Sequence, residues 1–425
     1  MTAPSTVPAG ARLLVIVNNF PPDRGGGAAV FGDLCYGLAA QGYDVTVRCA
    51  YPYYPEWRDK SGRNGWHIWR YDEHGVHVER YGLYIPKQAG SILPRLLHEA
   101  SFLLSLLRSV PRSRGFDAVM VICPALSSVV VAVLIRLLFR KPLWLNVQDL
   151  AVEAAAGSGL LKAGLLARTA RGLQRWLFNR ADLWSSISPV MCDALAAQRR
   201  RAQPLLLIPN WMDEDLGREI RRLHQERPRS GPRTPVRLLY GGNIGMKQNL
   251  LALLQHLQRS DADFQFTIHG DGAQAGAVRD WIASTADPRF RFGPLLDARG
   301  FAEALFDADY FVITESPNAG ASFMPSKLVG GIAAGLPILT VSDANSPLGS
   351  EVRGHNLGPW FGWDHLHKLT EFVTNLANDP EYHRQAVARS GCRAGDFERN
   401  RLVAHMGAVF ADLIAKRAPE GSDRR

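Results

Sequence analysis

The sequence predicts an α/β protein in which two doubly wound parallel-sheet domains follow one another along the chain. Short apolar runs alternate with helix-like segments, a pattern that is typical of a parallel sheet flanked by helices. The alternation stops in a polar, proline-rich stretch at residues 224–235 (HQERPRSGPRTP) and then begins again. The chain has 425 residues, which is more than the roughly 250–300 at which a single core stops growing. We therefore expect one domain on each side of that stretch.

The first domain is expected over residues 11–223, after a small, proline-rich tail at residues 1–10 that we expect to be disordered. Its strands are predicted from apolar runs separated by segments of helix length: residues 12–18, 44–50, 117–123, 142–148, 182–188 and 205–209. Because helix-like segments connect most of these runs, the strands are expected to run parallel.

The second domain is expected over residues 236–380, with residues 224–235 as the linker. Its strands are predicted at residues 236–242, 264–270, 289–293, 309–314 and 337–341. A charged, helix-like segment at residues 381–425 is expected to pack back on the first domain and to end in a short tail. Ligands of doubly wound sheets lie beyond the carboxyl ends of the strands, so the loops that follow the strands are the candidate site.

Charge and cysteine content limit the classes of partner and the compartment. Lysine and arginine exceed aspartate and glutamate by nine, which favours an anionic partner such as a nucleotide, a nucleic acid or an acidic membrane. The five cysteines are scattered and form no CxxC pair, so we expect reduced thiols and a cytosolic location. We find no signal peptide and no stretch of about 18 uncharged apolar residues that would span a membrane.

Glycine-rich loops follow several predicted strands. Gly25 to Gly27 follow the first strand, and Gly241-Gly242 open a loop that carries Lys247. Glycine lets the backbone approach a ligand closely, and free N–H groups at a helix start attract anions, so the second loop could hold a diphosphate with Lys247 as a point charge. Flexible turns and a solvated lysine are equally compatible with these residues. The stretch HGDGA (269–273) has the same strand–glycine–helix pattern, although on its own an ordinary tight turn is the favoured interpretation.

A second anion site is predicted where MPSKLVGG begins a helix. Pro325 suits the first turn of a helix, so Ser326 and Lys327 would lie at its positive end, unless this is a plain surface helix.

Carboxylates follow the strand at residues 142–148. Asp149 and Glu153, with Gln148, would lie at the carboxyl edge of the first sheet. A carboxylate there could orient an acceptor hydroxyl or take its proton. The alternative is that Asp149 caps the following helix.

Two segments, residues 91–114 and 159–181, combine an apolar stripe with basic residues. Helices of this kind can lie on an anionic membrane surface, although they could also face the core and present a solvated basic side.

Taken together, these motifs resemble family 4 glycosyltransferases, which have the GT-B fold of two Rossmann-like domains facing a cleft. The resemblance extends over roughly residues 12–416. The segments that carry it are residues 50–58 (AYPYYPEWR), 144–156, 186–191, 207–213, 240–250 (YGGNIGMKQNL), 269–273 and 324–338 (MPSKLVGGIAAGLPI).

The resemblance implies that the second domain holds a nucleotide sugar and the first domain holds the acceptor. The implied donor-binding residues are Gly26, Gly27, Gly242, Asn243, Lys247, Gly270, Asp271, Phe292, Gly293, Ser326 and Lys327. The implied acceptor-binding residues are Tyr53, Trp57, Gln148, Asp149 and Glu153. Asp149 and Lys247 are the catalytic candidates.

The sequence departs from the family at the helix that follows MPSK. The family usually has a glutamate there that holds the ribose, and Gly330 stands in its place, while Ser322 matches the partner glutamate eight residues earlier. Two adjacent glycines in a helix each cost about 1 kcal/mol. Our hypothesis is that Gly330 and Gly331 remove side chains where the donor or a neighbouring strand comes close, and that Glu315 is a candidate to hold the ribose instead.

The function implied by the resemblance is retaining transfer of a sugar, from a donor of the GDP-fucose or GDP-mannose type, to a polyprenyl-diphosphate-linked saccharide in exopolysaccharide biosynthesis. The enzyme would act at the inner face of the cell membrane, without metal or cofactor and without a nucleic-acid partner. A nucleotide-sugar epimerase of the same fold and a non-catalytic binding subunit remain as alternatives.

Overall fold

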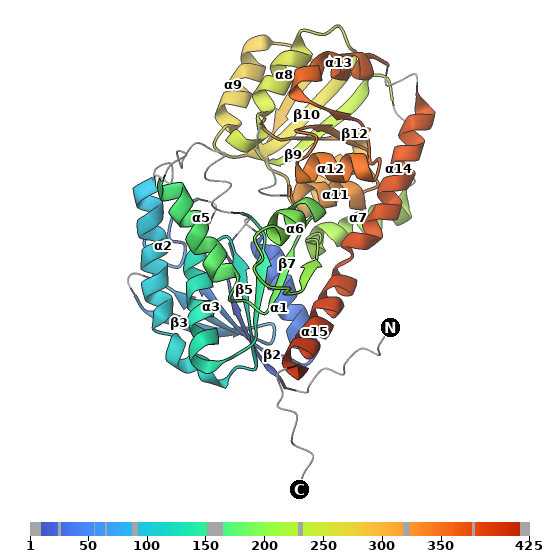
Figure 1. The fold of residues 1–425 in the computed structure, drawn as a ribbon. Helices are drawn as coiled ribbons and strands as arrows, with labels where there is room; N and C mark the ends of the chain where they lie inside the picture. Colours follow the sequence, from blue (N-terminus) through green and yellow to red (C-terminus); the bar gives the residue numbers. More distant parts are fainter. Residues whose placement is uncertain are drawn as a thin grey trace. The chain divides into compact units, whose positions relative to one another are not determined.

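The computed structural model describes residues 10–23, 27–54, 56–63, 66–86, 92–150, 165–227, 233–317, 324–375 and 379–416. The chain forms two compact units (Figure 1). Unit 1 runs from the amino terminus to Pro209 and takes up the chain again from Arg399, and unit 2 comprises Asn210–Glu398.

Within the described residues, unit 1 contains an eight-stranded sheet in the order β3-β4-β2-β1-β5-β6-β7-β8. Its strands are β1 (Arg12–Ile16), β2 (Asp44–Ala50), β3 (Ile68–Glu73), β4 (Val76–Tyr81), β5 (Ala118–Cys123), β6 (Leu143–Val147), β7 (Leu183–Ser186) and β8 (Leu205–Leu207). Its α-helices are α1 (Ala28–Ala40), α2 (Ile92–Leu107), α3 (Leu126–Phe139), α5 (Leu165–Phe178), α6 (Pro189–Ala196) and α15 (Arg399–Ala415). The pairing is parallel except between β3 and β4, which form an antiparallel hairpin at one edge.

Unit 2 contains a six-stranded parallel sheet in the order β11-β10-β9-β12-β13-β14, as far as the structure describes it. Its strands are β9 (Val236–Asn243), β10 (Phe264–Asp271), β11 (Phe290–Gly293), β12 (Tyr310–Thr314), β13 (Ile338–Val341) and β14 (Trp360–Phe361). Its α-helices are α7 (Glu214–Glu226), α8 (Leu250–Gln258), α9 (Ala275–Thr285), α10 (Ala298–Asp307), α11 (Lys327–Ala333), α12 (Pro347–Gly354), α13 (Leu366–Asn375) and α14 (Pro380–Ala394).

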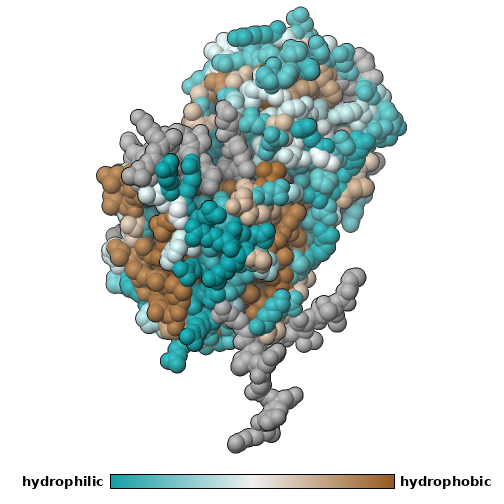
Figure 2. Space-filling model, in the orientation of Figure 1, coloured by the Kyte–Doolittle hydropathy of each residue, from teal (hydrophilic) through white to brown (hydrophobic). Residues whose placement is uncertain are grey.

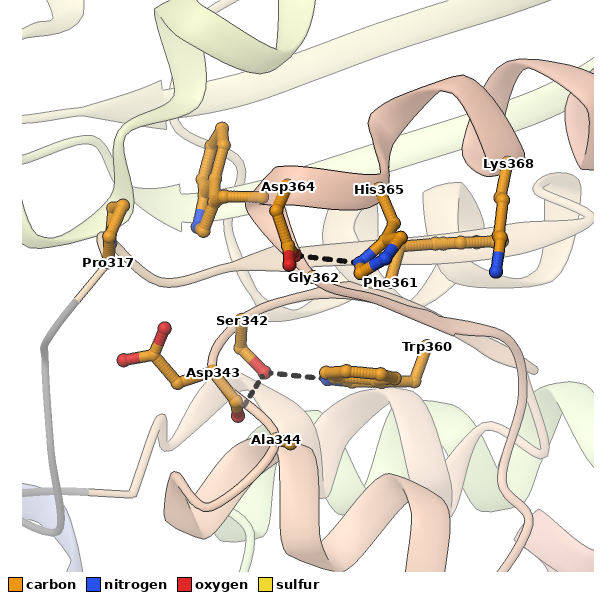
Figure 3. Close-up of a pocket in the computed structure, with 11 residues that line it drawn as sticks. Pro317, Ser342, Asp343, Ala344, Trp360, Phe361, Gly362, Asp364, His365 and Lys368 are labelled. Atoms are coloured by element: carbon orange, nitrogen blue, oxygen red, sulfur yellow. Dashed lines mark hydrogen bonds and ion pairs between the residues drawn. The ribbon is translucent and has the colours of Figure 1, made fainter.

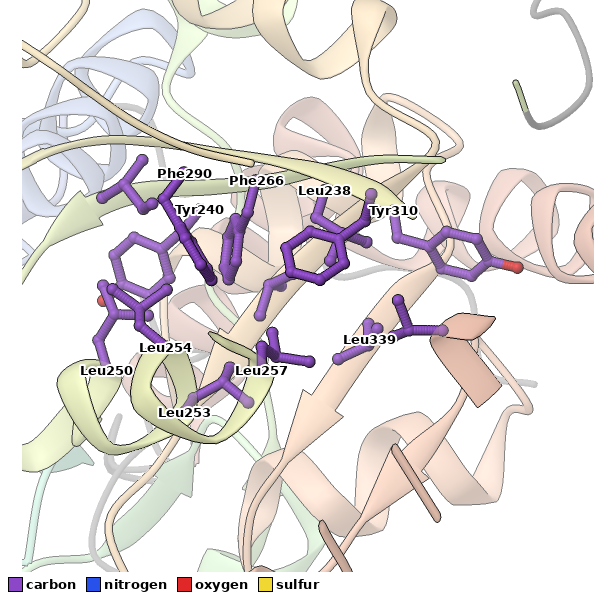
Figure 4. Close-up of a cluster of buried hydrophobic side chains, with 14 of the residues drawn as sticks. Leu238, Tyr240, Leu250, Leu253, Leu254, Leu257, Phe266, Phe290, Tyr310 and Leu339 are labelled. Carbon is purple, nitrogen blue, oxygen red and sulfur yellow. The ribbon is translucent and has the colours of Figure 1, made fainter. Parts of the chain in front are cut away.

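Apolar side chains of α8 and of the strands form a hydrophobic core on one face of the unit 2 sheet (Figure 4). Helix α8 carries leucines at positions 250, 253, 254 and 257, the spacing that places them on one face of a helix. They are buried against alternate residues of the central strands, including Tyr240 and Phe266. Each such side chain contributes roughly 1.5–3 kcal/mol when it is fully buried, so this layer fixes the strands whose ends form the candidate site.

Unit 2 begins earlier than the polar stretch at residues 224–235 predicts. Helix α7 precedes most of that stretch, and its Ile220 and Leu223 belong to the same buried cluster as Leu305 and Phe306 of α10. The amphipathic α7 therefore packs on the second sheet, and the division of the chain falls at Pro209 rather than near residue 224.

The carboxyl-terminal segment is divided between the two units, whereas the sequence predicts that all of it packs on the first domain. Helix α14 stays with unit 2, where its His383 Nε2 lies 3.1 Å from the carbonyl oxygen of Asp309. Helix α15 packs on α1 and β5 of unit 1, and the hydroxyl of Tyr43 donates to the carbonyl of Gly407 at 2.7 Å. The change of unit occurs after Glu398, between the two helices.

Candidate active site

The switch point of the unit 2 sheet brings several of the predicted site residues to one edge. The strand order runs outward from β9 to β10 and β11 on one side, and from β12 to β13 and β14 on the other. Gly242 pairs with Gly270, and His269 pairs with Gly293, so these glycines lie at the carboxyl ends of three adjacent strands. Doubly wound sheets bind ligands at this kind of reversal.

The glycines at this edge are explained by the packing and backbone conformation of the protein, without a ligand. A Cβ on Gly270 would lie 2.2 Å from the carbonyl oxygen of Gly242, and a Cβ on Gly293 would lie 2.4 Å from the ring of His269. Gly242 has a φ of +100°, a conformation that favours glycine. These residues therefore let neighbouring strand ends come close together, and their presence alone does not indicate a ligand.

Lys247 lies in a short loop that is tied to the end of β12. Ser316 donates its backbone N–H to the carbonyl of Lys247 at 2.7 Å and its hydroxyl to the carbonyl of Met246 at 2.7 Å. The hydroxyl of Thr314 donates to the carbonyl of Gln248 at 2.5 Å. All three bonds hold backbone atoms of the loop, so they fix the exposed Lys247 at the switch point independently of its side chain.

Lys327 reaches the same turn from the other side of the switch point. Its Nζ lies 3.8 Å from the ring centre of Tyr240 and donates to the carbonyl of Asn243 at 3.4 Å. Burial against these groups lowers the pKa of Lys327 to about 7. An anion bound beside this amine would favour its protonated form.

The predicted helix-start site around Ser326 differs in the structure. Ser326 is exposed, its side chain makes no capping bond, and α11 has only seven residues. The helix start is therefore weak as an anion site, and the side chain of Lys327 is the feature that remains.

Glu315 is a buried carboxylate at the carboxyl end of β12, with only 1% of its surface exposed. Burial raises the pKa of Glu315 to about 7, and the charge of Asp343 adds to this, while the Ser346 hydroxyl and Lys247 oppose it. Its backbone carbonyl accepts a hydrogen bond from Trp363 Nε1 at 2.6 Å. A proton therefore titrates near neutral pH beside the Lys247 loop.

Two further donor candidates lie at the outer strands of this edge. Asp271 is exposed, and its carboxylate accepts the N–H of Gly272 at 2.7 Å. The ring of Phe292 is covered by the guanidinium of Arg279 at 5.1 Å.

In unit 1, Tyr53 is buried and held by polar neighbours. Asn18 Nδ2 donates to its hydroxyl at 2.8 Å, and His98 Nε2 lies 3.2 Å from the same oxygen. Asp23 accepts the N–H groups of Tyr53 and Tyr54 at 2.8 and 2.9 Å. With 2% of its surface exposed, Tyr53 positions the segment that carries Trp57 and is not itself open to an acceptor.

The half-exposed Trp57 packs on Tyr53, with ring centres 5.3 Å apart, and has a φ of +51°.

The remaining predicted residues of unit 1 lie in loops that follow strands. Gln148 and the half-buried Asp149 follow β6, and the Gln148 amide donates to Asn146 Oδ1 at 2.6 Å. Gly27 begins α1 with a φ of +81°. Gly26, Glu153 and Ser322 lie outside the described residues.

Comparison with known proteins assigns the reaction class. Residues 25–211 match the glycosyl transferase 4-like domain. Over 347 residues, the chain is 29% identical to the putative colanic acid biosynthesis glycosyl transferase WcaI of Escherichia coli K12, covering 80% of this chain and 85% of that protein. The chain is a glycosyltransferase.

Solved structures show the GT-B fold. A sucrose-phosphate synthase from Thermosynechococcus elongatus aligns with a TM-score of 0.69 at 16% identity, covering 96% of this chain and all of that one. Anabaena HepE in complex with UDP and glucose aligns with a TM-score of 0.64 at 14% identity, covering 95% and 100%. WaaG, a glycosyltransferase involved in lipopolysaccharide biosynthesis, aligns with a TM-score of 0.61 at 14% identity, covering 93% and 99%. The predicted fold and the family 4 resemblance are confirmed.

Sequence reasoning missed three residues of this glycosyltransferase that shape the unit 1 edge, namely Asn18, Asp23 and His98. Asn18 and Asp23 follow β1, so their place after a strand was a usable signal. His98 sits within the apolar stripe of residues 91–114, and its contact with Tyr53 depends on how α2 packs. Burial lowers the pKa of His98.

The two glycines of α11 have different neighbours. A Cβ on Gly331 would lie 2.8 Å from Ile338 of β13 and 2.8 Å from Phe311 of β12, so a strand does come close there. A Cβ on Gly330 would lie 3.4 Å from Leu216 of α7 and 3.9 Å from Phe301 of α10, which are ordinary contacts. The hypothesis of a close strand is therefore right for Gly331 and wrong for Gly330.

We expect Gly331→Ala to destabilise the glycosyltransferase by about 1–3 kcal/mol, because the added methyl group would overlap the side chains of Phe311 and Ile338 and push α11 away from the sheet. Gly330→Ala is expected to leave stability unchanged or to raise it by up to about 1 kcal/mol, because alanine favours the helix. Urea unfolding of the two variants measures the difference. Equal destabilisation by both would contradict this assignment.

Proposed function

We propose that this glycosyltransferase takes a nucleoside-diphosphate sugar as donor and transfers the sugar, with retention, to a polyprenyl-diphosphate-linked saccharide in exopolysaccharide biosynthesis. The observation that carries the donor class is that Lys247 and Lys327 both lie beside the carboxyl end of β9. Two amines at a switch point suit a diphosphate, which gains negative charge as the glycosidic bond breaks.

In this proposal the two lysines have different roles. Lys247 is exposed on a fixed loop and meets the developing charge of the leaving diphosphate. Lys327 holds the phosphates through an amine whose pKa near 7 rises when an anion binds. Gly242 and Asn243 are the last two residues of β9, beside these lysines, and Glu315 is retained as a candidate for the ribose.

The base would lie beside the outer strand ends, at Gly270, Asp271, Phe292 and Gly293. A GDP-fucose or GDP-mannose type of donor is proposed from the likeness to the colanic acid relative. HepE, which shares the fold, is described in complex with UDP and with UDP-glucose. A donor with a uracil base is therefore the competing proposal.

The acceptor would be held by unit 1. Asp149 would position the acceptor hydroxyl, and Gln148, Glu153 and Trp57 would contact the saccharide. In a retaining reaction of this kind, the departing phosphate can take the hydroxyl proton, so Asp149 need only orient the nucleophile. The proposal assigns no metal, and no cluster of three metal-ligating His, Cys, Asp or Glu side chains occurs among the described residues.

A nucleotide panel tests the donor class directly. We expect one of GDP, UDP, ADP and dTDP to stabilise the protein by about 2.7 kcal/mol at 100 times its dissociation constant. Lys327→Ala should reduce that stabilisation, whereas the exposed lysine variant Lys60→Ala in unit 1 should not. If no nucleotide stabilises the protein, or if Lys327→Ala binds as well as wild type, the diphosphate site is not at this switch point.

We further propose that unit 1 binds the anionic inner face of the cell membrane through α2, α3 and α5. These helices pack side by side in the order α2-α3-α5, and Figure 2 shows apolar residues gathered over α2. Exposed apolar side chains of the three helices are Leu93, Leu96, Leu97, Leu104, Leu137, Leu138, Leu173 and Trp176. Arg168 and Arg171 are exposed on α5 beside them. No described helix is long and apolar enough to cross a bilayer.

Replacing Arg168 and Arg171 by glutamine is expected to weaken binding to phosphatidylglycerol vesicles about 30-fold, because each basic residue near an anionic surface contributes about 1 kcal/mol. The triple change Leu93, Leu96 and Leu97 to serine should weaken binding at both low and high salt. Leu295→Ser, on an exposed leucine of unit 2, is the control. Sedimentation with vesicles measures both, and unchanged binding by the arginine and leucine variants would remove this surface.

A further inference from the structure

A pocket of about 620 Å³ lies in unit 2 at the carboxyl ends of β13 and β14 (Figure 3). It belongs to the half of the sheet that lies beyond β12, whereas the predicted base-binding residues lie on the half formed by β10 and β11. Its size falls within the roughly 300–1,000 Å³ of small-molecule sites. The proposed donor contacts do not use it.

Two tryptophans of the pocket are held with their N–H groups already bonded. Trp360 Nε1 donates to Ser342 Oγ at 3.2 Å, and Trp363 Nε1 donates to the carbonyl of Glu315 at 2.6 Å. Arg353 covers one face of Trp360, with its guanidinium carbon 4.9 Å from the ring centre. The indoles are therefore fixed in orientation, and what they offer to a ligand is flat apolar surface.

Polar side chains line both walls of the pocket. Figure 3 shows Ser342 and Asp343 on the same wall as Trp360, with Asp364, His365 and Lys368 on the opposite wall. Asp364 lies 2.8 Å from His365 Nδ1, and both side chains are substantially exposed. Two carboxylates can accept hydrogen bonds from hydroxyl groups, and the ammonium of Lys368 can donate to a ring or hydroxyl oxygen.

We propose that this pocket is a binding site for a neutral saccharide unit. The C–H face of a pyranose ring would stack on Trp360, and its hydroxyls would bond to Asp343, Asp364 and Lys368. The carboxylates of Asp343 and Asp364 balance the charges of Lys368 and of the Arg353 guanidinium against Trp360, so the pocket has no excess positive charge that would favour a phosphate or a uronate.

The pocket wall is joined to the proposed active site through Trp363. Its bond to Glu315 ties the turn at residues 362–365 to the end of β12, where Ser316 holds the Lys247 loop. A saccharide in the pocket would thus lie on the same rigid edge as the donor site. If the proposed function is right, the pocket holds a non-reacting sugar of the glycan, but saccharide binding itself does not depend on that function.

Binding in the absence of a sugar-nucleotide donor tests the proposal. Purified full-length protein is titrated with cellotriose, mannotriose and β-1,4-galactotriose, and with GMP as the rival stacking ligand, by saturation-transfer NMR and calorimetry. We expect saturable binding of at least one trisaccharide. Any binding of GMP to the protein should be the same in the wild type and in Trp360→Leu. Trp360→Leu, which keeps an apolar side chain beside Arg353, should weaken binding about tenfold.

Lys368→Ala provides a second variant at an exposed position, where loss of folding is not expected. Loss of a charge-assisted hydrogen bond should weaken saccharide binding about fivefold or more. Trp66→Leu, at an exposed tryptophan of unit 1, is the matched control and should bind as wild type does. The proposal is overturned if no trisaccharide binds, if Trp360→Leu binds equally well, or if the pocket binds GMP instead. Because no donor is present, these results do not depend on whether the switch point binds a nucleotide.

Discussion

Replacing Lys247 by alanine is expected to lower kcat by about 10²-fold or more, because it removes one preorganised positive charge from the leaving diphosphate. The protein should still fold, since the bonds from Thr314 and Ser316 that hold the Lys247 loop are accepted by backbone carbonyls. The substitution leaves these carbonyls in place. The measurement is single-turnover sugar transfer from the cognate donor, alongside urea unfolding.

Two further variants distinguish the effect of the Lys247 charge from the effect of the position of its loop. Lys247→Arg keeps the charge but changes its shape, so partial activity is expected. Ser316→Ala leaves Lys247 in place and removes only the hydroxyl bond to the Met246 carbonyl, so a smaller loss is expected. A folded Lys247→Ala protein with wild-type turnover would show that the diphosphate charge is stabilised elsewhere.

The positions of most strands were readable from the sequence because each strand is a local apolar run. The runs at residues 12–18 and 236–242 become β1 and β9, the central strands of their sheets. The hairpin of β3 and β4 was not predicted, since β3 has no buried residue and charged or polar residues interrupt β4, so neither strand is a continuous apolar run. The assignment of α7 and α14 to unit 2 depends on packing between distant segments, which local patterns do not contain.

The candidate site also contains residues that the sequence could identify and residues that it could not. Gly270 was found because it ends a predicted strand, and Lys247 because it lies in the loop after another, and the carboxyl ends of neighbouring parallel strands meet at one edge. The burial of Tyr53 and the different surroundings of Gly330 and Gly331 could not be predicted, because each results from side chains far away in sequence. The pocket beside Trp360 likewise joins residues 317, 342–344 and 360–368.

The buried carboxyl of Glu315 is expected to make the stability of unit 2 depend on pH. Its ordinary pKa is 4.5, and burial raises that pKa to about 7 in the folded protein. Between these two values the folded state retains a proton that the unfolded state releases, so stability falls as pH rises from about 4.5 to about 7 and is constant above that. A shift of this size corresponds to about 3 kcal/mol.

Glu315→Gln should abolish this pH dependence, because glutamine has a similar shape and does not titrate. We expect the variant to match wild type near pH 5 and to exceed its stability at pH 8 by about 3 kcal/mol. Urea unfolding from pH 5 to pH 8 measures the difference between the two proteins at each pH.

Glu351 provides a matched control with the opposite expected sign. It is also buried in unit 2, but it accepts a hydrogen bond from Arg393 Nε at 2.6 Å. Glu351→Gln breaks this ion pair and leaves Arg393 with less compensation, so it should lower stability at pH 8. If Glu315→Gln behaves in the same way, then Glu315 is ionised and paired in the folded protein at neutral pH. Its charge would then be a permanent feature beside Lys247, and the proton that the structure assigns to this edge would be absent.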